Sequence, residues 1–431
     1  DCQYFQMSTI FALASGSLPA ALAIYRISGP RSIDALIGMT KRKIWKPRYM
    51  YHTKVYDKDG AWFDSAMASF FPGPGTFTGE DSAEFFVHGS YAVVNQMEKS
   101  LSSLPGLRYA TAGEFSKRSL VNGKINVHEM NALGALLQST TQRQLEQATR
   151  AYEQGNWLQH RLTHIRSKVA VLADFGEDVR SDPNEIRKDI ENLLNDVKEK
   201  MKKGMAGDRV RKGIRCVLVG RPNAGKSSLF NRLCGFDRSI VSNFPGTTRD
   251  TVEMKRLIGG INVTIEDTAG IHSSTDPIEK EGIARSIHKM NEADLILAVI
   301  DASSSNEHVL PLIPTHIPSI VIYNKADLIS NVLPSMKKSD VVLTSAISPI
   351  GCEALENKLE EKVLELCGNG NSELTLSAGI AEVEKLLEEC LLHDDIGLTN
   401  EILQMASEAW GRCDTNEQLI SNIMTNFCIG K

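Results

Sequence analysis

One stretch decides the fold of this chain: Gly220-Arg221-Pro222-Asn223-Ala224-Gly225-Lys226-Ser227. It has the pattern G-x-x-x-x-G-K-S, follows an apolar run at 214–219 and precedes a helical pattern that reaches Gly235. Glycines let such a loop curl so that its backbone N–H groups face phosphate oxygens, and the dipole of the next helix favours the same negative charge. We therefore predict a phosphate-binding loop in which Lys226 bridges the β- and γ-phosphates and Ser227 ligates Mg²⁺.

Outward from this loop, apolar strands alternate with helical patterns, as in a doubly wound sheet of mainly parallel strands. The predicted strands are 214–219, 262–267, 295–301, 319–324 and 341–345. Before this region, short apolar runs at 21–27, 66–71 and 83–87 are broken by Gly and Pro, which is typical of an α+β domain.

Helical periodicity flanks the doubly wound region on both sides, and we expect one long helix to start at Pro183 and end at Gly204. A helical domain that is split by an inserted domain explains this order. We predict an N-terminal α+β domain (1–120), a helical domain in two parts (121–212 and 369–431) and an inserted Ras-like α/β domain (213–368).

The strand at 319–324 ends in Asn324-Lys325-Ala326-Asp327, which fits N-K-x-D. The Asp327 carboxylate can accept hydrogen bonds from N1–H and the 2-amino group of guanine. Adenine offers no such pair of donors and would leave a buried carboxylate unpaired, so GTP is preferred over ATP. We expect Lys325 to lie along the base, and Ser345-Ala346 at the next strand end to contact it.

Two further segments are predicted to contact the γ-phosphate and the Mg²⁺ ion. In Asp267-Thr268-Ala269-Gly270 (D-x-x-G), Asp267 should hold Mg²⁺ through water and the Gly270 N–H should meet the γ-phosphate. Upstream, Thr248 is the predicted second Mg²⁺ ligand. The full set of predicted GTP contacts is Asn223, Ala224, Gly225, Lys226, Ser227, Ser228, Thr247, Thr248, Asp267, Thr268, Ala269, Gly270, Asn324, Lys325, Asp327, Ser345 and Ala346.

The residue after Gly270 is Ile271, where Ras-like GTPases have a glutamine that orients the attacking water. An isoleucine cannot do this, and Arg249 is the one candidate for an arginine finger. The central domain resembles the potassium-dependent TrmE-Era-type GTPases, which carry an asparagine in the phosphate loop, as here at Asn223. The resemblance implies catalysis by Lys226, water positioning by Glu279 (with Glu281 as the alternative) and a K⁺ ion held by Asn223, Ser242, Phe244 and Thr247.

Motifs outside this domain resemble the MnmE (TrmE) family of tRNA wobble-uridine modification GTPases. They occur in the family's order and cover nearly the whole chain. They are Ile24-Tyr25-Arg26-Ile27-Ser28-Gly29-Pro30, Phe77-Thr78-Gly79-Glu80-Asp81, His88-Gly89, Gly113-Glu114-Phe115, Asn122-Gly123-Lys124 and Phe427-Cys428-Ile429-Gly430-Lys431.

The resemblance implies an N-terminal domain that forms a homodimer and binds 5,10-methylene- or 5-formyl-tetrahydrofolate. The implied folate contacts are Arg26, Glu84, Lys124 and Lys431, in which basic groups pair with a polyglutamate tail and Glu84 accepts from the pterin. Cys428 is either a catalytic nucleophile or a redox-sensitive bystander.

The resemblance also implies partners and a reaction. A flavin-dependent MnmG-family protein would form a heterotetramer with this chain and modify position 5 of the wobble uridine of tRNA, by a carboxymethylaminomethyl or taurinomethyl route. The alternatives are a ribosome- or RNA-associated assembly GTPase and a degenerate interaction protein.

Composition limits the remaining possibilities. The net charge of −5 argues against binding nucleic acid with the whole surface, but Lys41, Arg42, Lys43, Lys46 and Arg48 form a dense basic run, which a solvated loop would also explain. No apolar run reaches the roughly 18 residues of a membrane span, and the eight cysteines include no C-x-x-C pair.

The chain starts at Asp1, so we expect a processed form or fragment. It departs from the family at Ser15–Ala20, at Ala112 and around 374–380, which suggests a mitochondrial matrix protein, with a bacterial cytoplasm as the alternative.

Overall fold

A computed structural model describes residues 8–175, 183–235, 239–240, 253–267, 286–304, 310–329, 340–368 and 377–411. The chain divides into two compact units. The first consists of Asp1–Leu137, Tyr152–Ile190 and Lys385–Lys431, and the second of Gln138–Ala151 and Glu191–Glu384. Each unit is described here by itself.

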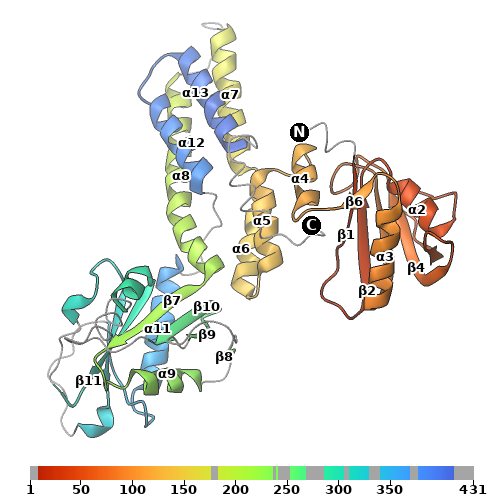
Figure 1. The fold of residues 1–431 in the computed structure, drawn as a ribbon. Helices are drawn as coiled ribbons and strands as arrows, with labels where there is room; N and C mark the ends of the chain where they lie inside the picture. Colours follow the sequence, from red (N-terminus) through yellow and green to blue (C-terminus); the bar gives the residue numbers. More distant parts are fainter. Residues whose placement is uncertain are drawn as a thin grey trace. The chain divides into compact units, whose positions relative to one another are not determined.

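A six-stranded sheet of order β3-β4-β5-β2-β1-β6 forms the N-terminal part of the first unit (Figure 1). All neighbours pair antiparallel except β1 and β6, which are parallel. The strands are β1 (Thr9–Leu13), β2 (Ala20–Ser28), β3 (Tyr51–Tyr56), β4 (Trp62–Phe71), β5 (Ser82–Gly89) and β6 (Leu107–Tyr109).

Helices α2 (Ser32–Thr40) and α3 (Tyr91–Ser103) cover one face of this sheet. Alternate strand residues such as Tyr25 and Phe85 point into the core that these helices close. On the opposite face, Phe115 of α4 (Glu114–Val121) packs with a small cluster that includes Ile10 and Ala12. The sheet is therefore covered fully on one face and in part on the other.

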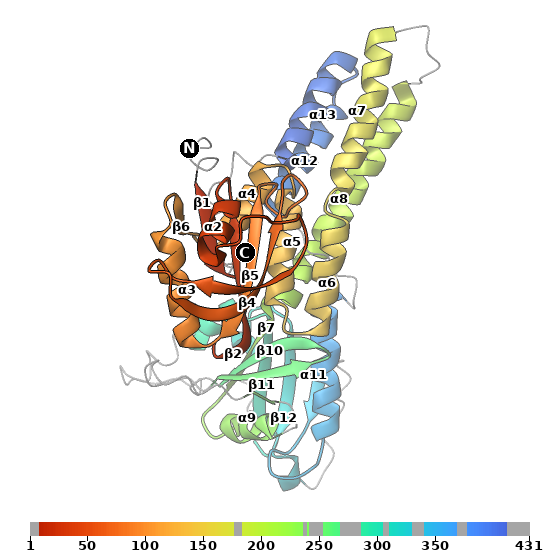
Figure 2. The same cartoon turned by 90° about the vertical axis from the view of Figure 1, so that its right-hand side faces the viewer.

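The rest of the described chain in the first unit is helical. Helices α7 (Trp157–Phe175) and α13 (Ile396–Gly411) lie side by side (Figure 2), and Gln159 of α7 donates to Ser407 of α13 at 2.8 Å. The long helix α8 (Pro183–Lys212) contributes to both units, as does α12 (Ser377–Cys390). Helix α5 (Val127–Gln138) follows α4 in sequence, and α6 (Gln142–Glu153), which precedes α7, belongs to the second unit as far as Ala151.

The second unit contains a seven-stranded sheet of order β13-β12-β11-β7-β10-β9-β8. The five strands from β13 to β10 are parallel, and β9 and β8 pair antiparallel at one edge. The strands are β7 (Ile214–Gly220), β8 (Ser239–Ile240), β9 (Glu253–Ile258), β10 (Ile261–Asp267), β11 (Leu295–Asp301), β12 (Ser319–Asn324) and β13 (Val341–Leu343).

Both faces of this sheet are buried, which is why its central strands are continuous apolar runs. In β7, Cys216 and Leu218 face a core closed by α9 (Lys226–Cys234) and α11 (Cys352–Leu366), while Val217 and Val219 face a second core that includes Met290. The helical residues 286–292 and short 3₁₀ segments at Leu310–Leu312 and Ala326–Leu328 lie between the strands of this sheet in sequence.

The predicted fold class is confirmed: an α+β N-terminal part, helices, and a doubly wound sheet of mainly parallel strands. The expected end of the long helix at Gly204 is wrong. Helix α8 continues to Lys212, and Gly213, with φ +84°, ends it. Within the described ranges, no helix combines the length and apolarity that crossing a membrane requires.

Candidate functional site

The phosphate loop joins the end of β7 to the start of α9, and two glycines are required by its geometry. A Cβ atom at Gly220 would collide with the carbonyl oxygen of Val299 in the neighbouring strand β11. Gly225 has φ +90° and lies against the side-chain amide of Asn324. Only glycine fits positions with so little space or such a backbone angle, so the sequence pattern has a direct steric cause.

Lys226 lies inside the curl of this loop. Its Nζ donates to the carbonyl oxygens of Gly220 at 3.2 Å and Arg221 at 3.1 Å, and the residue is 7% exposed. Burial lowers the pKa of Lys226, and the nearby charge of Asp267 opposes that shift. Asn223 is exposed in the same loop, with φ +61°. The loop therefore presents one ammonium and one amide side chain beside its backbone N–H groups.

Two predicted magnesium-site residues meet at the edge of the sheet. The Ser227 hydroxyl at the start of α9 donates to Oδ2 of Asp267, the last residue of β10, at 2.7 Å. The other carboxylate oxygen of Asp267 is buried and has no hydrogen-bond partner within the described residues. A hydroxyl and a carboxylate are hard oxygen donors of the kind that Mg²⁺ prefers, so this pair fits that ion.

Asn324, at the end of β12, ties the phosphate loop to the base-recognition segments. Its Nδ2 donates to the carbonyl oxygen of Ala224 at 3.0 Å, and its Oδ1 accepts from the backbone N–H of Ala346 at 3.0 Å. The residue is 1% exposed. Three loops that are far apart in sequence are thus held by one amide group.

Each of the other two base-recognition side chains has a partner that orients it. The hydroxyl of Ser345 donates to Oδ1 of Asp327, and Lys325 Nζ lies 2.6 Å from Oδ2 of Asp301 at the end of β11. Burial alone would raise the pKa of Asp301, but hydrogen bonds from Lys325 and Ser303 outweigh it and hold that pKa below its ordinary value. The Asp301 carboxylate therefore stays charged and fixes the position of Lys325.

Asp301 was missed in the sequence, although an aspartate at the carboxyl end of a buried strand was an available signal. The structure brings the predicted residues of the phosphate loop, 223–228, together with Asp267, Asn324, Lys325, Asp327, Ser345 and Ala346. Ser228 lies exposed in the first turn of α9. Several predicted site residues lie outside the described residues: Ser242, Phe244, Thr247, Thr248, Thr268, Ala269, Gly270, Glu279, Cys428 and Lys431.

In the N-terminal sheet, two of the predicted folate contacts pair with each other. Arg26 on β2 and Glu84 on β5 are cross-strand neighbours, and Nε of the arginine lies 2.9 Å from Oε1 of the glutamate. Their side chains are 25% and 20% exposed. Lys124 is exposed on the turn after α4, beside Gly79. The Arg26–Glu84 pair is accessible enough to meet a polar ligand.

The face that carries this pair is the one opposite α2 and α3, because the alternate residues Tyr25 and Phe85 face the helix side. Apolar side chains stand on the same face: Leu22 is 55% exposed and Met67 is 36% exposed. An ion pair surrounded by accessible apolar groups is suited to a flat, partly polar ring or to a second protein surface.

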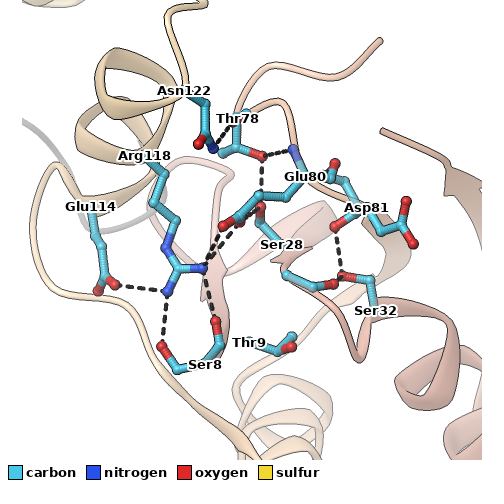
Figure 3. A network of polar contacts seen from close by, with 12 residues as sticks. Ser8, Thr9, Ser28, Ser32, Thr78, Glu80, Asp81, Glu114, Arg118 and Asn122 are labelled. Atoms are coloured by element: carbon cyan, nitrogen blue, oxygen red, sulfur yellow. Dashed lines mark hydrogen bonds and ion pairs between the residues drawn. The ribbon is translucent and has the colours of Figure 1, made fainter. Parts of the chain in front are cut away.

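A buried polar network fixes the loop between β4 and β5 (Figure 3). Arg118 of α4 is 2% exposed and donates to Glu80 Oε2 at 3.0 Å, to the Ser8 carbonyl oxygen at 2.8 Å and to Glu114 Oε1 at 3.2 Å. Glu80 also accepts from Ser28 at 2.7 Å. The motif segments around residues 28, 78–81 and 114 therefore converge on one arginine.

Sequence reasoning noticed those motif segments as separate signals but missed Arg118, which connects them. Asn122 belongs to the same assembly, since its Nδ2 donates to the Thr78 carbonyl oxygen at 2.6 Å (Figure 3). The network explains why a T-G-E-D run, a G-E-F run and an N-G-K run occur in one domain.

The phosphate loop, the Asp267 edge and the base-recognition loops together define a GTP-binding protein of the P-loop class, joined to a second functional part. Family models match in the same two places: "GTP-binding protein TrmE N-terminus" over residues 9–124 and "50S ribosome-binding GTPase" over residues 215–325. The chain is an enzyme, a GTPase.

Whole-chain relatives are more specific. The tRNA modification GTPase MnmE of Chelativorans sp. (strain BNC1) is 35% identical to this chain, and the alignment spans 98% of each of the two chains. The MnmE proteins of Rickettsia canadensis and Bartonella tribocorum are 34% and 33% identical to this chain. Each alignment spans 99% of this chain and 100% of the relative. The chain belongs to the MnmE family of tRNA modification GTPases.

Solved structures resemble parts of the chain. One is Era bound to MgGDPNP and nucleotides 1506–1542 of 16S ribosomal RNA, 29% identical, covering 35% of this chain and 56% of that one, with a TM-score of 0.30. Another is the G domain of the T. maritima FeoB iron transporter, 28% identical, covering 36% of this chain and 98% of that one, with a TM-score of 0.28.

Proposed function

We propose that this chain hydrolyses GTP with Mg²⁺ and K⁺ and uses that cycle to modify the wobble uridine of tRNA. GTP hydrolysis is supported by two contacts of the phosphate loop: Ser227 of the loop bonds to Asp267, and Asn324 bonds to the backbone of the loop. Lys226 supplies positive charge at the β- and γ-phosphates, and Asp327, oriented by Ser345, selects guanine.

The two metal ions have different roles in this proposal. Mg²⁺, held by Ser227 and Thr248 with Asp267 beside it, neutralises phosphate charge. K⁺, held by Asn223, Ser242, Phe244 and Thr247, supplies the positive charge that an arginine finger supplies in other GTPases. The exposed Asn223 amide suits a cation of this kind. Glu279 is proposed to position the attacking water.

GTP turnover should depend on potassium. We expect wild-type turnover to be at least tenfold faster in KCl than in NaCl of equal ionic strength, since in this proposal K⁺ supplies positive charge to the transition state. Asn223→Ala should lose this stimulation and still bind GTP. Steady-state phosphate release and fluorescent nucleotide titration measure the two quantities. Asn231→Ala, at an exposed asparagine of α9, is the control. Equal rates of the wild type in both salts would remove K⁺ from the mechanism.

The N-terminal sheet is proposed to bind a reduced folate and to form the homodimer. The Arg26–Glu84 pair, with the exposed apolar groups Leu22 and Met67 on the same face, supports both roles. Glu84 accepts from the donors of a pterin, and Arg26 and Lys124 pair with carboxylates. Lys431 and Cys428 are proposed to complete this site. The folate supplies the one-carbon unit.

The relatives are named as tRNA modification GTPases, which supports tRNA as the substrate of this chain. A flavin-dependent MnmG-family partner and a carboxymethylaminomethyl or taurinomethyl product complete the proposal. The departures from the family motifs support a mitochondrial member.

Arg26→Ala should weaken 5-formyl-tetrahydrofolate binding by at least tenfold and prevent restoration of the modified nucleoside in a strain that lacks its own MnmE-family protein. The reason is that it removes a charged partner of the ligand and leaves Glu84 unpaired. Equilibrium dialysis and mass spectrometry of tRNA nucleosides measure these effects. Lys99→Ala, at an exposed lysine of α3, is the control.

Two results would contradict the proposal in different ways. If Arg26→Ala bound folate as the wild type does, the folate site would lie elsewhere. If the wild type neither bound folate nor restored the nucleoside, a ribosome-associated GTPase switch would be the better reading, in line with the family match of residues 215–325.

A further inference from the structure

The loop between α2 and β3 concentrates positive charge on a chain that is acidic as a whole. Between residues 41 and 50 there are five Lys and Arg and no Asp or Glu, whereas the whole chain has a net charge of −5. We call the exposed side chains of Lys41, Arg42, Lys43, Lys46, Arg48 and Tyr49 the basic patch. The patch lies beside β3, the edge strand of the N-terminal sheet.

The cations of the basic patch lack acidic partners. Within the described part of the chain, none of the five forms an ion pair with a carboxylate. The side chains of Lys41, Arg42, Lys46 and Arg48 meet carbonyl oxygens or aromatic rings instead. Elsewhere in the same domain, Arg26, Arg108 and Arg118 are each paired with a glutamate. The charge of the patch is therefore not compensated locally and is available to an anionic partner.

Aromatic side chains hold the patch in a defined shape. Trp45 is 6% exposed, and its Nε1 donates to the carbonyl oxygen of Arg42 at 3.0 Å. The guanidinium of Arg42 lies 3.7 Å from the ring centroid of Tyr51, and the hydroxyl of Tyr51 accepts from the backbone N–H of Lys46 at 3.3 Å. The backbone N–H of Arg48 donates to Phe70 in β4 at 2.8 Å. These contacts fix the backbone of the loop, so the patch presents its charges in a defined arrangement.

We propose that the basic patch is a docking surface for the sugar–phosphate backbone of tRNA, an inference that rests on the proposed function. Lys43 and Lys46 pair with phosphates as mobile point charges, and Arg42 and Arg48 present planar donors to phosphate oxygens. Tyr49, 51% exposed, offers a ring on which an unpaired base can stack.

The combination of features favours RNA over an anionic membrane. Uncompensated cations on a fixed loop match the regular negative charge of a nucleic-acid backbone. Stacking on an exposed tyrosine is a mode of recognition that unpaired RNA bases provide and lipid headgroups do not. The remaining surface is acidic on average, so the patch would also fix the orientation in which tRNA approaches.

The test uses the full-length protein and an unmodified tRNA transcript with uridine at the wobble position. The variant Lys43→Glu/Lys46→Glu reverses two patch charges whose side chains make no hydrogen bond or ion pair in the described residues. The control Lys99→Glu/Lys385→Glu makes the same charge change at exposed lysines elsewhere. Filter binding at several salt concentrations gives the Kd and the slope of log K against log [salt]. Thermal unfolding and GTP turnover without tRNA check that each variant is intact.

For the patch variant we expect a Kd at least tenfold weaker at low salt and a slope smaller in magnitude by about 2, because two phosphate contacts are lost. The control should bind as the wild type does. If the patch variant keeps wild-type Kd and slope, or the control weakens equally, the patch is not the docking surface, although tRNA remains the substrate. If the wild type binds phosphatidylglycerol vesicles but not tRNA, both this inference and the proposed function are overturned.

Discussion

Replacement of Lys226 by methionine is expected to lower GTP turnover by about a thousandfold. Methionine keeps an apolar stem of similar size in the buried position but has no ammonium group to meet the charge that develops on the transferred phosphoryl group. Burial lowers the pKa of Lys226, so removing its charge relieves a desolvation cost, which offsets part of the loss of its hydrogen bonds to Gly220 and Arg221. Single-turnover measurements with excess enzyme separate the chemical step from nucleotide binding.

Lys255→Met is the matched control for this prediction. Lys255 is an exposed lysine on β9 of the same domain, and its replacement should leave turnover within twofold of wild type. If Lys226→Met kept more than a tenth of the wild-type rate, Lys226 would only support the loop, through its bonds to Gly220 and Arg221.

The second large effect concerns stability. Arg118→Met should destabilise the N-terminal domain by about 3–5 kcal/mol, because Glu80 would lose the arginine that pairs with it and the buried Glu114 would lose one of its two arginine partners. Burial by itself would raise the pKa of Glu114. Donors from Arg108, Thr111 and Arg118 hold that pKa below its ordinary value instead, so the carboxylate is charged in the native state and needs a cation beside it.

Hydrogen exchange of the full-length protein measures this effect, read from peptides that cover β1, β2 and β6. Arg108→Met is the control: the Arg108 side chain is 37% exposed, and its loss still leaves Glu114 paired with Arg118. Its effect should be clearly smaller. Equal protection of these strands in Arg118→Met and wild type would show that the buried charges are tolerated without the arginine.

Most of the central domain was predictable because local signals agree with the tertiary structure. A buried parallel strand must be apolar on both faces, so the runs that became β7, β11 and β12 were visible in the sequence with nearly correct ends. Gly204 misled the prediction of α8. A glycine inside a helix costs only about 1 kcal/mol, and the buried helical face continues to Val210, so packing outweighs the local preference.

The candidate site was predictable where one short motif carries the chemistry, as in the phosphate loop and N-K-A-D. It was not predictable where the chemistry depends on contacts between distant segments. Arg118 meets Ser8, which is 110 residues away, and Glu80, which is 38 residues away. Neither separation produces a repeating pattern in the sequence from which the contact could be predicted. The Arg26–Glu84 pair is similar, because cross-strand register arises only when the sheet forms.

The two bonds of the Asn324 side chain have a consequence for engineering. The amide holds both the phosphate loop, at Ala224, and the predicted base-recognition segment, at Ala346. Its loss should therefore weaken the binding of every nucleotide, whatever its base. Among the described residues, Asp327 has no such bond to the phosphate loop; its carboxylate accepts from the Ser345 hydroxyl. A designer who wants this enzyme to accept another purine should therefore vary Asp327 and leave Asn324 untouched.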